Sequence, residues 1–144
     1  MKSIIVFCSM MTCIAIYSSC SSNNLGDNIY LLDGDRKEDR IIVNCTGKSF
    51  GDCITGTYLI PRKYEEHFIN GRYSEYVDNA KANDDYVIAS TVCLGSNGKR
   101  YWIIDKKMKR LNNGESNDSL FVLGPFALKS FLEETKRRNI HLNL

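Results

Sequence analysis

Short runs of apolar and β-branched residues, separated by turns rich in glycine, asparagine and aspartate, dominate the pattern along the chain. Runs of this length and composition are typical of strands. Residues 86–94 (YVIASTVCL) form the longest run and are apolar on both faces, which predicts a central strand. The predicted strands are residues 28–32, 40–45, 54–60, 86–94, 100–105 and 120–123.

Two other stretches have apolar residues at helical spacing, which predicts amphipathic helices lying on the sheet. Pro125 follows Gly124, and we expect this pair to begin the second helix because proline is favoured in the first turn. Residues 62–69 predict one further brief helix. The first stripe comprises Tyr73, Tyr76, Val77 and Ala80, and the second comprises Leu128, Phe131, Leu132 and Thr135.

These elements predict an α+β fold: an antiparallel sheet of five or six strands, with two helices packed on one face. Tyr101 and Trp102 are adjacent in a predicted strand, so their side chains must point to opposite faces. The helices cover one face only, which leaves one aromatic side chain on the other. Tyr101 and Trp102 are therefore candidate binding residues, although the outer one also suits packing under a loop.

The first twenty residues have the order of a secretory signal: Lys2, an apolar run over residues 4–17, small residues, and then a boundary at Cys20. The apolar run is shorter than the ~20 residues that a membrane-spanning helix needs. An ordinary secretory peptide, with Cys20 as an incidental thiol, is the alternative interpretation. The polar residues 21–24 that follow indicate a flexible tether.

The small residues before Cys20 make this segment resemble a bacterial lipoprotein signal, in which the peptide is removed and the new N-terminal cysteine carries acyl chains (diacylglycerol and palmitate). Tyr17 stands where leucine is common, and such loose signals are familiar in Bacteroidota. The YWII-type strand and the Gly-Pro pair before the last helix also resemble the uncharacterised small lipoproteins of that phylum. The resemblance implies anchoring in the bacterial cell envelope, and Ser21 after the cysteine favours the outer membrane.

The predicted organisation is a signal peptide over residues 1–19, a lipidated tether over 20–27 and a single α+β domain over 28–144. Without Lys2, the Lys and Arg residues nearly balance the 17 Asp and Glu residues. There is no basic stripe, which argues against a nucleic-acid partner. The expected partners are the membrane, through the lipid, and an unidentified protein.

Of the six cysteines, two are removed with the signal peptide, Cys20 is assigned to lipid, and three remain, so they cannot all pair within one chain. Cys45 and Cys53 flank a turn-rich loop, and they are the candidate disulfide in an oxidising compartment. Two reduced, half-buried thiols are the alternative. Cys93 lies in an apolar run, where a small buried hydrophobic residue is expected.

Candidate chemistry is sparse. Residues 47–51 match G-x-S-x-G, but a nucleophile elbow needs a helix after Ser49, and a strand is predicted there. Only His67 and His141 are available as bases, and no zinc-type spacing occurs, so no metal or cofactor is expected. Ser119, in Asp118-Ser119-Leu120, matches an O-glycosylation acceptor of some Bacteroidota.

Two main hypotheses follow. The first is a non-catalytic, lipid-anchored module that binds a protein partner, for example as an inhibitor or immunity factor. The second is a small envelope hydrolase that uses Ser49 or a Cys–His pair. A structural component of an envelope assembly is a third.

Overall fold

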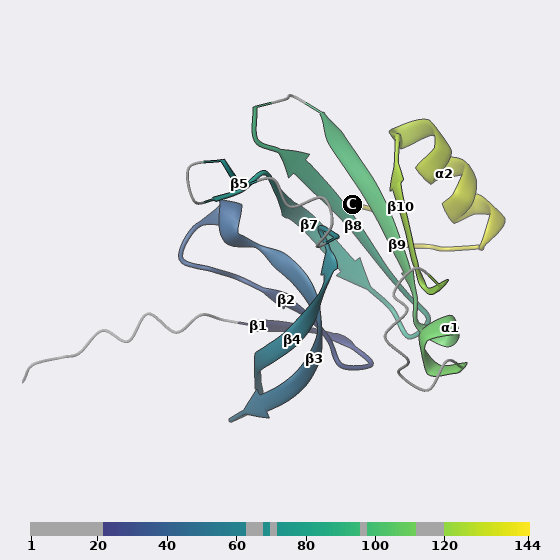
Figure 1. Cartoon of the computed structure of the whole chain (residues 1–144). Helices are drawn as coiled ribbons and strands as arrows, with labels where there is room; N and C mark the ends of the chain where they lie inside the picture. Colours follow the sequence, from purple (N-terminus) through teal and green to yellow (C-terminus); the bar gives the residue numbers. More distant parts are fainter. Residues whose placement is uncertain (1–21, 63–67, 70–71, 96–97, 112–119) are drawn as a thin grey trace, which may run out of the picture.

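Two antiparallel four-stranded sheets packed face to face form the body of the molecule (Figure 1). The computed structural model describes residues 22–62, 68–69, 72–95, 98–111 and 120–144. The strand order is β1-β2-β3-β4 in the first sheet, called the N-terminal sheet, and β10-β9-β8-β7 in the second, called the C-terminal sheet. The strands of the N-terminal sheet are β1 (Ser22–Gly26), β2 (Ile29–Leu32), β3 (Ile41–Ser49) and β4 (Asp52–Ile60). Those of the C-terminal sheet are β7 (Glu75–Ala82), β8 (Tyr86–Cys93), β9 (Lys99–Asp105) and β10 (Val122–Phe126).

The remaining elements are short. A two-stranded hairpin, β5 (Phe68–Ile69) and β6 (Arg72–Tyr73), connects the two sheets in sequence. The 3-10 turn η1 (Lys37–Asp39) precedes β3, and the helix α1 (Lys106–Leu111) follows β9 directly. The helix α2 (Leu128–Arg137) packs on the outer face of the C-terminal sheet, so the layers are sheet, sheet and helix (Figure 1).

The main core lies between the two sheets. Ile29, Ile42 and Ile60 project into it from the N-terminal sheet, and Val87 and Trp102 project from the C-terminal sheet, all fully buried. The backbone also joins the sheets, because the Val77 N–H donates to the Arg40 carbonyl oxygen at 2.9 Å. Burial of this apolar surface is the main stabilising contribution to the sandwich.

The predicted fold class is wrong. The strands divide into two sheets that bury each other's inner faces, instead of forming one sheet of five or six strands under two helices. Among the described residues, α2 is the one helix that covers a sheet face, because the six-residue helix α1 lies at the end of β9. The six predicted strands are all present with shifted ends. The apolar pattern did not indicate which strands belong to which sheet.

The helix predicted from the stripe at Tyr73, Tyr76, Val77 and Ala80 is wrong, because Tyr73 ends the short strand β6 and the other three residues lie in strand β7. The reason is a β-bulge: Val77 pairs with Thr91, but Asn79 pairs with Ser90. One extra residue in the strand places Val77 and Ala80 on the same face, and both contact the main core. A spacing of three thus arises in a strand and imitates a helical period.

The predicted helix start at Gly124-Pro125 is also wrong. Both residues lie in β10, at a bulge between Leu123 and Phe126 on the edge of the sheet, where proline is tolerated. Gly124 has φ +125°, and a Cβ there would lie 2.8 Å from the Tyr101 carbonyl oxygen, so only glycine fits. The helix begins later, at Leu128.

The predicted tether over residues 20–27 extends too far, because the sheet already begins at Ser22. Ser22–Gly26 forms β1, an edge strand that pairs with β2. Its asparagines satisfy local hydrogen bonds, such as that from the Gly26 N–H to Asn24 Oδ1 at 2.8 Å. The predicted brief helix over residues 62–69 lies largely outside the described residues, and its last two form β5.

Candidate functional site

Ser49 does not occupy a nucleophile elbow. It is the last residue of β3 and pairs with Asp52 across a two-residue turn, so a strand follows the motif instead of a helix. The sequence-based objection to G-x-S-x-G is confirmed in this respect. Of the two candidate bases, His141 is exposed beyond α2, and His67 lies outside the described residues. Cys93, for which a small buried hydrophobic residue was expected, is half-buried at the end of β8.

The predicted disulfide between Cys45 and Cys53 is confirmed. It joins the two strands of the β3–β4 hairpin, and both residues are buried in a second apolar cluster on the outer face of the N-terminal sheet. Tyr30 and Val43 belong to the same cluster. Lys48 lies over the Tyr30 ring at 5.1 Å and donates to Asn28 Oδ1 at 2.8 Å, which fixes the hairpin against β2.

Trp102, one of the two candidate binding residues, does not reach the surface. Its side chain is 0% exposed and lies between the sheets. Its indole Nε1 donates to Thr91 Oγ1 at 2.9 Å, and the Thr91 hydroxyl donates to the buried Glu75 carboxylate. Arg100 Nη1 lies 3.6 Å from Glu75 Oε2, and its positive charge compensates that of the carboxylate. The chain of hydrogen bonds satisfies every polar atom that the tryptophan and threonine bring into the core, so these residues have a structural role.

Tyr101 points to the opposite face, as predicted from its place beside Trp102. Its ring stacks on Phe131 of α2, with 5.0 Å between centroids and 26° between planes. Tyr101 is half-buried and lines a groove of about 300 Å³ between α2, the chain after it and the outer face of the C-terminal sheet. Of the two candidate binding residues, only Tyr101 therefore reaches a surface hollow.

The helical stripe predicted for α2 is divided between core and surface. Phe131 and Thr135 are buried against the sheet, whereas Leu128 and Leu132 are 52% and 56% exposed. The two leucines lie one turn apart and line the same groove as Tyr101. Periodicity identified the stripe, but it did not separate the side chains under the helix from those at the rim of the groove.

A charged group forms the polar side of this groove. Asp78 and Lys99 both line it, with 2.8 Å between Asp78 Oδ2 and Lys99 Nζ. Lys37 approaches the other oxygen of Asp78 at 2.6 Å. Hydrogen bonds from these two ammonium groups lower the pKa of Asp78 below its ordinary value. Two cations around one carboxylate leave this side of the groove with excess positive charge.

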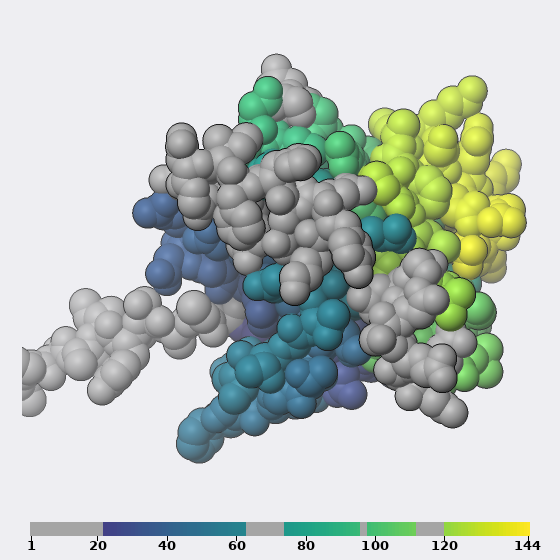
Figure 2. Space-filling view, viewed as in Figure 1, coloured from purple at the N-terminus to yellow at the C-terminus, as the bar shows by residue number. Residues whose placement is uncertain are grey.

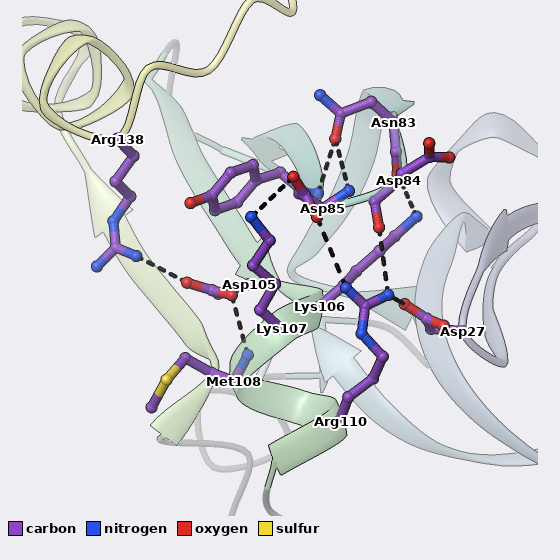
Figure 3. A network of polar contacts seen from close by, with 11 residues as sticks. Asp27, Asn83, Asp84, Asp85, Asp105, Lys106, Lys107, Met108, Arg110 and Arg138 are labelled. Atoms are coloured by element: carbon purple, nitrogen blue, oxygen red, sulfur yellow. Dashed lines mark hydrogen bonds and ion pairs between the residues drawn. The ribbon is translucent and has the colours of Figure 1, made fainter.

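A second charged network, around α1, has a structural role (Figure 3). Lys107 and Arg110 reach Asp85 at 3.0 and 3.6 Å, and Arg110 also contacts Asp27 at 2.8 Å. Asp27 lies in the β1–β2 turn and Asp85 in the β7–β8 turn, so α1 holds one end of the two sheets together. At the other side, Arg138 pairs with the buried Asp105 at 2.9 Å and fixes the end of α2.

Several sequence-based candidates lie outside the described residues. These are the lipidation candidate Cys20, the signal peptide over residues 1–19 and the glycosylation candidate Ser119. Within the part of the chain that the structure describes, no helix combines the length and apolar character needed to span a membrane, and no cluster of three or more metal-ligating side chains occurs.

Comparisons with known proteins found no family model, no curated protein and no solved structure that matches this chain.

Proposed function

We propose that this chain is a lipoprotein of the bacterial cell envelope, anchored in the outer membrane by acyl chains on Cys20, that binds a protein partner without catalysing a reaction. The anchor is supported by the order of the first twenty residues: a basic residue, an apolar run, small residues and a cysteine. The family proposed is that of the small uncharacterised lipoproteins of Bacteroidota. Ser49 has no catalytic role in this proposal, because it ends β3 and is followed by a hairpin turn and strand β4 instead of a helix.

The observation that carries the binding role is the exposure of Leu128 and Leu132 at the rim of the Tyr101 groove. Half-exposed leucines one helical turn apart gain from being covered, since burial of apolar area is favourable. A tyrosine stacked on a phenylalanine provides a rigid aromatic base of the kind enriched at protein interfaces. Lys37 and Lys99 add positive charge beside it. The expected partner is a protein surface with apolar side chains and a neighbouring carboxylate.

The test is a pair of substitutions, Leu128→Ser and Leu132→Ser, made together in the tagged full-length protein. We expect them to leave folding intact, because both side chains point outward, and to reduce recovery of the cross-linked partner by about tenfold or more, the change that ~1.4 kcal/mol produces. Recovery would be measured after chemical cross-linking in intact cells.

The matched control is Leu111→Ser, which removes an exposed leucine from α1, away from the groove. It should leave partner recovery unchanged. Undiminished recovery in the double variant, with the circular dichroism spectrum of the wild type, would contradict the assignment of the partner to the α2 groove.

A further inference from the structure

The tip of the β3–β4 hairpin exposes a bulky aromatic side chain in a backbone conformation that disfavours it. Phe50 is 105% exposed and has φ +50°, followed by Gly51 at φ +93°. Two-residue hairpin turns with both central φ values positive prefer Asn, Asp or Gly at the first position. A phenylalanine there is strained and contacts nothing that would compensate, so the fold itself gives no reason for it.

A second apolar side chain extends this surface. Ile54, near the start of β4, is 64% exposed. Phe50 and Ile54 line one edge of a mixed hollow of about 580 Å³, whose other lining residues include the apolar Leu32, Ile41 and Cys53 and the acidic Asp33, Asp39 and Asp52. Figure 2 shows the hairpin, in blue and teal, projecting at the lower left of the molecule. The hairpin therefore projects two exposed apolar side chains, Phe50 and Ile54, and its carboxylate Asp52 lies between them in the sequence.

The start of β1 is bound to this tip. Ser22 Oγ donates to Asp52 Oδ1 at 2.7 Å, and the Cys53 N–H donates to Ser22 Oγ at 3.3 Å. Cys20 precedes Ser22 by two residues in the sequence, so only one residue separates the proposed lipidation site from this contact. Acyl chains on Cys20 would start beside the apolar tip.

We propose that Phe50 and Ile54 insert into the surface of the phospholipid bilayer in which Cys20 is anchored, so that the hairpin is a second membrane contact. This inference rests on the lipid anchoring proposed above. Asp52 sets the depth of insertion, since a carboxylate is costly to place in hydrocarbon and has to stay in the hydrated interface. The Cys45–Cys53 disulfide joins the two strands behind the tip and limits their separation.

A second contact would fix the orientation of the domain, which a lipid on a single residue does not do. The hairpin tip and α2 lie at opposite ends of the molecule, at the lower left and the upper right of Figure 1. With the tip in the lipid, the groove lined by Tyr101, Leu128 and Leu132 faces away from the membrane.

The experiment uses the mature lipidated protein, which begins at Cys20, reconstituted in vesicles of phosphatidylethanolamine and phosphatidylglycerol, some of them brominated on the acyl chains. Trp102 is the chain's only tryptophan and is buried, so it provides a constant background. In the variant Phe50→Trp, the added emission should shift to shorter wavelength and be largely quenched by the brominated lipid. Ile54→Trp should behave in the same way and serves if the first variant does not fold.

The matched control is Leu132→Trp, an exposed position on α2, whose added emission should be unquenched. Co-flotation with the vesicles reports anchoring separately. Co-flotation without quenching at positions 50 and 54 would overturn the inference and leave the anchor standing. Loss of both co-flotation and quenching would overturn both proposals. A blue shift in detergent that grows with protein concentration would assign the tip to a second copy of the chain, against the inference.

Discussion

Replacing Trp102 with alanine is expected to reduce the free energy of unfolding by about 3–5 kcal/mol, the cost of removing a large side chain from a packed core. The Trp102 side chain is 0% exposed and belongs to the core cluster that residues of both sheets form. Its loss also removes the indole donor to Thr91 Oγ1. Single domains have a stability of roughly 5–15 kcal/mol, so this change consumes a large part of it.

The measurement is urea unfolding of the purified protein, followed by circular dichroism because the variant lacks tryptophan. Tyr101→Ala is the matched control: it removes the adjacent aromatic side chain, which is half-buried on the other face. The cost for Tyr101 should be clearly smaller than for Trp102. Equal costs, or a larger cost for Tyr101, would contradict the assignment of the main core to the space between the sheets.

Replacing both Cys45 and Cys53 with serine is expected to destabilise the domain by about 2–3 kcal/mol, because the disulfide closes a short loop and restricts the unfolded chain. The two cysteines are separated by eight positions in the sequence. Two small buried polar groups would also replace the disulfide in the cluster around Tyr30 and Val43. The effect should be measurable as a lower urea midpoint.

The internal control is the wild type unfolded in the presence of a reducing agent, which should approach the double variant. Mass spectrometry of unreduced, alkylated peptides reports the bond directly. Two alkylated thiols at these positions in the exported protein, or identical midpoints with and without reductant, would contradict the prediction.

The existence of most strands was predictable because each strand has its own local pattern. Residues 86–94 and 100–105 are continuous apolar runs, and they form β8 and β9 at the centre of the C-terminal sheet. The disulfide was also predictable, since Cys45 and Cys53 flank one hairpin turn. These features depend on residues close together in the sequence.

The division into two sheets was not predictable in this way, because it depends on contacts between distant segments. β2 and β3 are buried on both faces, as β8 and β9 are, and nothing local states that the first pair packs against the second. The bulges at Val77 and at Gly124 also misled the prediction of strands and helices, because an extra residue changes the apolar spacing within a strand. The exposure of Leu128 and Leu132 followed from the same long-range packing.

The most direct test of lipid anchoring at Cys20 is metabolic labelling with a radioactive or clickable fatty acid, followed by membrane fractionation. The wild type should incorporate the label and fractionate with membranes, whereas Cys20→Ala should do neither. Cys13→Ala, which removes a cysteine from within the predicted signal peptide, is the matched control and should label like the wild type. A Cys20→Ala variant that still labels and still fractionates with membranes would contradict the account of this chain as a lipoprotein anchored at Cys20.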